Sequence, residues 1–228
     1  MKKILFVAAA LTLMCSPLVR AQVKLDVDGL KAKAAKSDAD IANAKKNAKA
    51  ATWLDRGKTM LEIADAPTLG AYAGMDEKSA DMMFGKGTAK TEKIGDKSYR
   101  AKSYPNITTY MTKEGEVYKV QFWMSKTEII ADPLGQATEA YMKAYSIDAG
   151  SAGKVRDGQN SVGNKYKEMA NNYISLQKYP EAAGMLAKAF DVQLAPPLAV
   201  VDTLVGFNAG FLYTAANNFT EGEKYLTK

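Results

Sequence analysis

The stretch QATEAYMKAYSID, residues 136–148, decides the fold. Ala137, Tyr141 and Ala144 recur at a spacing of four and then three, which places them on one face of a helix. The pattern is typical of the second helix of a two-helix unit. The residues directly before it do not show the pattern of a first helix, so the partner is expected farther upstream.

Two downstream segments show what that partner should look like, because the helical pattern repeats. In YKEMANNYISLQKYPEAAGMLAKAF and GFNAGFLYTAANNFTEGEKYLTK, a small residue of the first helix precedes one of the second by 12 positions. These pairs are Ala170 with Ala182 and Gly210 with Gly222. The segments resemble the tetratricopeptide repeat family, in which small residues let two antiparallel helices approach closely. Departures include Gly206 in place of a large first-helix residue and long links between the units.

The segment WLDRGKTM, residues 53–60, supplies the missing first helix. Trp53 and Gly57 stand four apart, like Tyr166 and Ala170, but Gly57 precedes Ala137 by 80 positions instead of 12. We therefore expect a split repeat over 53–150 with an insertion at about 67–132. The predicted fold is mainly α, an antiparallel helix-pair solenoid with a β-hairpin inserted in its first repeat. An Ala/Lys-rich helical segment at 22–52 precedes it, and two repeats at 151–228 follow, the last incomplete.

The insertion changes period along its length. Residues 67–97 are polar and glycine-rich, which predicts mainly loop with one short helix. In YPNITTYMTKEGEVYKVQFWMSKTEII, residues 104–130, the alternation predicts strands, with Tyr118, Val120, Phe122 and Met124 on one face and KEGE as the turn. A glycine-rich link is expected at 149–163 and a break at Pro196–Pro197.

The N-terminus has the features of a cleaved signal peptide at 1–21. Lys2 and Lys3 precede the apolar run ILFVAAALTLM, and Val19 and Ala21 occupy the small-residue positions of a cleavage site after Ala21. A lipoprotein signal at Cys15 is the alternative, although Met14 stands where that signal needs a small residue. We expect an exported chain, periplasmic or envelope-associated, without an integral membrane span. Its end at 228 is expected to continue into a longer protein, or to be covered by a partner or second copy.

Composition argues against catalysis and nucleic-acid binding. The sequence contains no histidine, and its one cysteine lies in the signal peptide, which removes the usual nucleophile and base pairs. Loss of the signal lowers the net charge from +6 to +3, so the basic balance is weak. LDVDGL, residues 25–30, carries only part of a calcium-loop pattern and is interpreted as a disordered N-terminus. We expect no enzyme activity, no cofactor and no metal.

The resemblance implies a concave groove, lined by the first helices, that takes a protein or peptide. Lys167, Asn171 and Asn208 resemble part of the clamp by which some family members hold a peptide carboxylate, but its two further basic residues have no counterpart here. A scaffold or adaptor role is predicted, with the oligomeric state left open. The expected binding residues are Lys58, Glu62, Lys167, Asn171, Ser175, Phe207, Asn208 and Phe211.

The alternative function is glycan binding or glycan processing by the aromatic residues of the hairpin. The simpler interpretation of these residues is that one face of the hairpin packs on the helices of the split repeat. The aromatic set is Tyr104, Tyr110, Tyr118, Phe122 and Trp123. The lysines and arginine between Lys90 and Lys102 are interpreted as a solvated loop. Asp202 either caps a helix or belongs to a short O-glycosylation pattern with Thr203 and Leu204.

Overall fold

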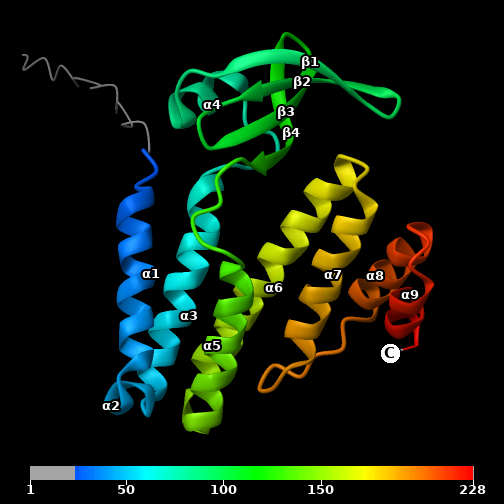
Figure 1. The fold of residues 1–228 in the computed structure, drawn as a ribbon. Coiled ribbons are helices and arrows are strands. Elements are labelled where there is room, and N and C mark those ends of the chain that lie inside the picture. The colour runs from blue at the N-terminus through cyan, green and yellow to red at the C-terminus, as the bar shows by residue number, and fades with distance from the viewer. Residues whose placement is uncertain (1–23, 228) are drawn as a thin grey trace, which may run out of the picture.

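A computed structural model describes residues 24–227 of the chain. In that range the chain forms nine α-helices and one four-stranded antiparallel sheet. The sheet and the short helix α4 lie together over one end of a row of longer helices (Figure 1). The helices are α1 (Val27–Ala42), α2 (Ala44–Asn47), α3 (Ala50–Asp65), α4 (Glu77–Phe84), α5 (Pro133–Ile147), α6 (Ala152–Ser175), α7 (Tyr179–Leu194), α8 (Thr203–Ala215) and α9 (Phe219–Leu226). The strands are β1 (Thr88–Ile94), β2 (Lys97–Ser103), β3 (Ile107–Glu114) and β4 (Val117–Ser125).

The fold is therefore mixed α/β, and the prediction of a mainly α solenoid with one inserted hairpin is wrong. The segment at about 67–132 contains two hairpins in a single sheet, in the order β1-β2-β3-β4, together with α4. The first hairpin escaped prediction because its strands are built mainly from threonine, lysine and serine. Its turn is Gly95 and Asp96, where Gly95 has a φ of +57° that favours glycine.

Tyr141 holds three helices together. A Cβ atom on Gly57 of α3 would lie 2.7 Å from the Tyr141 ring, and one on Gly158 of α6 would lie 2.3 Å from it. Only glycine at both positions lets α3 and α6 approach the α5 tyrosine, which is 2% exposed. The predicted pairing of residues 53–60 with residues 136–148 is confirmed, because α3 and α5 pack along their length. The predicted link at 149–163 is wrong, since α6 begins at Ala152.

The two later helix pairs pack through the small residues that repeat in the sequence. Ala170 of α6 and Ala182 of α7 are both fully buried. A Cβ atom on Gly210 of α8 would lie 2.9 Å from the carbonyl oxygen of Gly222 in α9, so these helices also meet at glycine. Asp202 accepts a hydrogen bond from the Val205 amide and caps α8, as one of the two interpretations predicted.

The sheet buries both of its faces, and a β-bulge decides which strand residues share a face. Tyr110 pairs with Phe122, while the next residue, Met111, pairs with Val120, so Gln121 has no partner. Val120 and Trp123 consequently face α4, whereas Phe122 faces the opposite side with Tyr110. The prediction that Val120 and Phe122 share one face is wrong, because an extra residue in one strand reverses the alternation beyond it.

The N-terminal segment packs on the first helix pair instead of being disordered. Asp26 accepts a hydrogen bond from the Gly29 amide and starts α1 at Val27. Arg56 of α3 is 8% exposed and donates to Asp38 at 2.6 Å and to Gln136 of α5 at 2.8 Å. One guanidinium thus joins α1, α3 and α5. The predicted signal peptide lies outside the described residues.

Candidate functional site

The α3 part of the predicted groove is partly covered by α1. Lys58 is exposed, but Glu62 pairs with Lys33 of α1 at 2.5 Å. Leu54, one turn before Lys58, was also expected to line the groove, but it is buried in the core. The first unit therefore offers little free surface, because the Ala/Lys-rich helix lies against it.

The α6 part presents a polar face. Asn171 is exposed, and Lys167 and Ser175 are half-buried. The Ser175 hydroxyl donates to the Asn171 carbonyl oxygen at 3.0 Å, one turn earlier in the same helix. Such a back-bonded serine has little capacity left for a ligand. Lys167 and Asn171 keep side chains available for hydrogen bonds to a partner.

The α8 part presents an apolar face. Phe207 and Phe211 are 56% and 57% exposed, and their rings lie 6.3 Å apart in a stacked arrangement. Leu204, one turn before Phe207, is 66% exposed and was not among the predicted residues. Asn208, which was predicted, is half-buried beside them. We call Leu204, Phe207 and Phe211 the α8 apolar stripe.

The aromatic residues of the sheet do not form an exposed platform. Tyr104, Tyr110, Phe122 and Trp123 are each at most 8% exposed. The Tyr110 and Phe122 rings stack with centroids 4.5 Å apart on the face opposite α4, where Leu176, the residue after α6, also packs. The rings are covered by the sheet itself, by α4 and by Leu176, whereas the simpler interpretation expected one face to pack on the helices of the split repeat.

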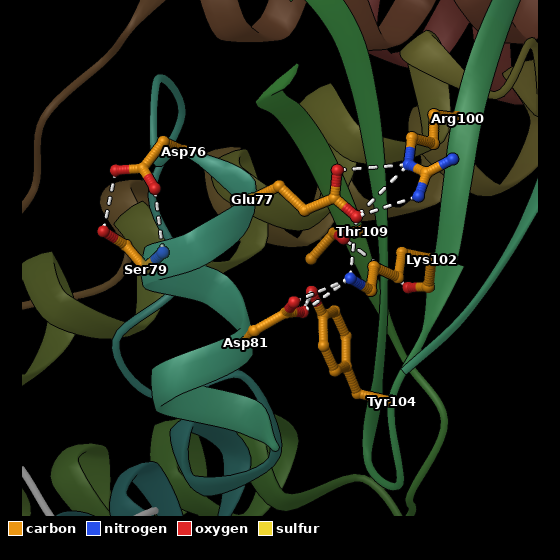
Figure 2. Close-up of polar contacts among 8 residues, drawn as sticks. All are labelled: Asp76, Glu77, Ser79, Asp81, Arg100, Lys102, Tyr104 and Thr109. Atoms are coloured by element: carbon orange, nitrogen blue, oxygen red, sulfur yellow. Dashed lines mark hydrogen bonds and ion pairs between the residues drawn. The ribbon is translucent and has the colours of Figure 1, made fainter. Parts of the chain in front are cut away.

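A network of charged residues fixes α4 on the sheet (Figure 2). Glu77 of α4 accepts a hydrogen bond from Lys102 at 2.7 Å and bonds from Arg100 at 3.1 to 3.2 Å. Lys102 also pairs with Asp81 at 2.7 Å, and the Tyr104 hydroxyl donates to Asp81 at 2.9 Å. Lys102 is 7% exposed, so its interpretation as part of a solvated loop is wrong.

The network shifts the pKa values of Glu77 and Lys102 in the direction that keeps both groups charged. Burial alone would raise the pKa of Glu77, but hydrogen bonds from Lys102 and Arg100 outweigh it and lower that pKa. Burial would lower the pKa of Lys102, but bonds to Asp81 and Glu77 raise it instead. Burial and the bond to Asp81 raise the pKa of Tyr104 well above its ordinary value. The tyrosine therefore stays protonated, and the arrangement supports packing more than proton transfer.

A cleft opens where the sheet meets the helices. It has a volume of about 430 Å³ and lies between the end of α3, the link 125–134, α6 and α7. A smaller pocket of about 120 Å³ shares Ala64, Ser125, Met169 and Tyr173 with it. We call the two together the junction cleft. Its distinguishing lining residues are Ile130, Asp132, Tyr166, Met185 and Lys188 in the larger part and Trp123, Lys165 and Asn172 in the smaller.

Sequence reasoning missed the cleft because its residues come from four distant segments. Tyr166 was identified only as a repeat position, and Asn172 was not distinguished from its exposed neighbours. The signal for Leu204 was present, since the chain carries no charged residue between Asp202 and Glu221. A helix without charge and with apolar residues on all sides normally has every face covered.

Three kinds of evidence bear on identity. Within residues 24–227, no cluster of carboxylate, histidine or cysteine groups could hold a metal ion. No helix in that range has the length and apolar character needed to cross a bilayer. No protein-family model, curated protein or solved structure matches the chain. The resemblance to the tetratricopeptide family stays a prediction from the residues.

Proposed function

We propose that the protein is a non-catalytic adaptor or scaffold that binds a partner protein through the α8 apolar stripe. The observation that carries the proposal is the absence of charge along α8 combined with the exposure of three large apolar side chains. Half of the exposed large hydrophobic residues in the described chain lie between Val200 and Leu226. Contiguous exposed apolar surface of this kind marks interaction sites in soluble proteins.

The proposed occupant is an amphipathic helix of another protein. Leu204, Phe207 and Phe211 are spaced by three and then four residues, which gives a straight apolar ridge along α8. Such a ridge fits between the anchors of a partner helix, whose apolar side chains recur at the same spacing. A partner that also reaches α6 would find N–H donors for its acidic groups on Lys167 and Asn171.

A photo-crosslinker placed at residue 211 tests the proposal. We expect p-benzoylphenylalanine at this position to capture a distinct protein in the native host, whereas the same group at Met142 of α5, which is 43% exposed, captures none. With the captured protein purified, Phe207→Ser/Phe211→Ser should weaken binding by at least about 30-fold, the loss typical of interface hot spots. Equal capture at both positions, or capture of a second copy only, would contradict an adaptor role.

We also propose that the protein is exported from the cytoplasm and lies in the periplasm or attached to the envelope. It rests on the charged start, apolar run and small-residue cleavage site of residues 1–21. Mass spectrometry of the protein from its native host should give a mature chain that begins at Gln22. A chain that retains Met1 and fractionates with the cytoplasm would contradict export.

A further inference from the structure

We propose that the junction cleft is a second binding site, separate from the α8 apolar stripe, for a small ligand with an apolar body and an oxygen acceptor. Its volume of about 430 Å³ falls in the range of small-molecule sites. Its position between the sheet and the helices is also one where such sites are common.

The larger part of the cleft supplies the apolar surface. Ile63, Ile129 and Leu134 form buried wall positions, and Met169 and Met185 add side chains that adapt to irregular shapes. A ligand body placed here would contact four segments of the chain in an open cleft, whereas the α8 apolar stripe is formed by a single helix.

The smaller part of the cleft supplies unmet hydrogen-bonding capacity. Trp123 and Asn172 are each 8% exposed and line the same pocket. The Trp123 indole nitrogen is buried and has no hydrogen-bond partner. Buried polar groups nearly always have a partner. An unpartnered donor in a pocket that the Asn172 amide also lines points to a ligand that completes it.

The chemistry of these groups selects an acceptor. An indole N–H only donates, whereas the Asn172 amide offers two N–H donors and one carbonyl acceptor, so the indole decides the choice. Lys165, which also lines the pocket, is already engaged with Asp65 at 3.1 Å, Thr68 at 3.0 Å and Glu168 at 2.9 Å. The unmet demand is therefore for a carbonyl or carboxylate oxygen. Met169 borders both parts of the cleft, so a ligand body in the larger part adjoins the pocket that Trp123 lines.

The rim of the larger part has features of a site that can adjust. Lys188 lies 3.4 Å from Asp132 and 5.6 Å from the centre of the Tyr166 ring, with about half of its side chain exposed. Asp132 has a φ of +42°, a left-handed conformation that is uncommon outside glycine and often occurs at functional positions. A long, exposed ion pair of this kind can exchange one partner for an anionic ligand at little cost.

The test uses three probes with the same tail: 4-phenylbutanamide, 4-phenylbutanoate and protonated 4-phenylbutylamine, the last without an acceptor. The chain has two tryptophans, and the Trp53 indole already donates to Asn47 at 2.8 Å, which makes it an internal control in ¹H–¹⁵N spectra. Trp53→Phe assigns the two indole signals. We expect the amide and the carboxylate to move the Trp123 signal and leave that of Trp53 in place.

Substitutions then locate the contact. Asn172→Leu should weaken binding of the amide about three- to tenfold, the effect of one lost hydrogen bond, while Asn164→Leu on an exposed face of α6 should not. Asn172→Ala, which removes the same amide without adding apolar bulk, serves if Asn172→Leu does not fold. If the wild type binds the carboxylate more tightly than the amide and Lys188→Met removes that difference, the site selects an anionic ligand. If the wild type binds both probes with equal affinity, it selects a neutral one. The proposal fails if the amine binds as tightly as the amide, if the Trp123 signal does not move, or if the cleft variants match Asn164→Leu.

Discussion

The sheet with α4 and the last helix pair, α8 and α9, differ in whether their surface side chains are paired within the chain. Between α4 and β2, the charged groups of Glu77, Asp81, Arg100 and Lys102 are paired within the chain. On α8, no charge is present, and apolar side chains that would ordinarily be covered are exposed. The first surface is paired within the chain, whereas the second is exposed and, under the proposed function, is covered by another protein. The difference separates residues that hold the fold from residues available for function.

The largest expected loss of stability comes from a substitution in the ion-pair network between α4 and β2. Lys102→Met removes the cation that lies between Glu77 and Asp81 and leaves Glu77 with only Arg100. Removing one partner of a buried ion pair typically costs about 3 kcal/mol of unfolding free energy. Urea unfolding should show this loss. Lys90→Met is the matched control, because the Lys90 side chain is 73% exposed and its loss should change stability by less than about 0.5 kcal/mol.

A smaller effect is expected where helices meet at glycine. Gly57→Ala places a methyl group 2.7 Å from the Tyr141 ring, so the α3–α5 contact must open. Overpacking of this kind costs about 2 kcal/mol. Gly163→Ala in α6 is the control, because its Cβ atom would have no neighbour closer than 3.9 Å. This substitution should stabilise the helix by about 0.5–1 kcal/mol. Equal unfolding free energies for the two variants would show that the close approach does not matter.

The contrast between these regions also explains what the sequence could predict. Contacts carried by small residues at helical spacing, such as Gly57 with Tyr141, follow from local pattern and were found across an insertion. The sheet was underestimated because its first hairpin has few apolar residues, and the ion pairs that join it to α4 link residues distant in the sequence. The bulge at Gln121 reverses the alternation by one residue, a change that only strand pairing determines.

Acid should destabilise the sheet and α4 without reaching the loss caused by Lys102→Met. Hydrogen bonds from Lys102 and Arg100, acting against burial, lower the pKa of folded Glu77 below its ordinary value of 4.5. Its contribution is therefore complete above pH 4.5 and is lost as the pH falls through the lowered pKa. The pKa of folded Lys102 is raised above its ordinary value of 10.5, so its contribution to stability is lost only as the pH rises through that raised pKa. Unfolding free energies measured from pH 7 to pH 2 should fall less steeply in Glu77→Gln than in the wild type.

The smallest effect on stability is expected on the α8 apolar stripe. Phe207→Ser/Phe211→Ser removes side chains that are more than half exposed, so the free energy of unfolding should change by no more than about 0.5 kcal/mol. The same double variant should lose the partner, because the apolar ridge is the proposed contact. Lys102→Met should do the reverse, with lower stability and unchanged partner binding at a temperature where it is folded. Large destabilisation by the α8 variant would mean that these phenylalanines support the fold itself, and the division between a surface paired within the chain and an exposed surface for a partner would no longer hold.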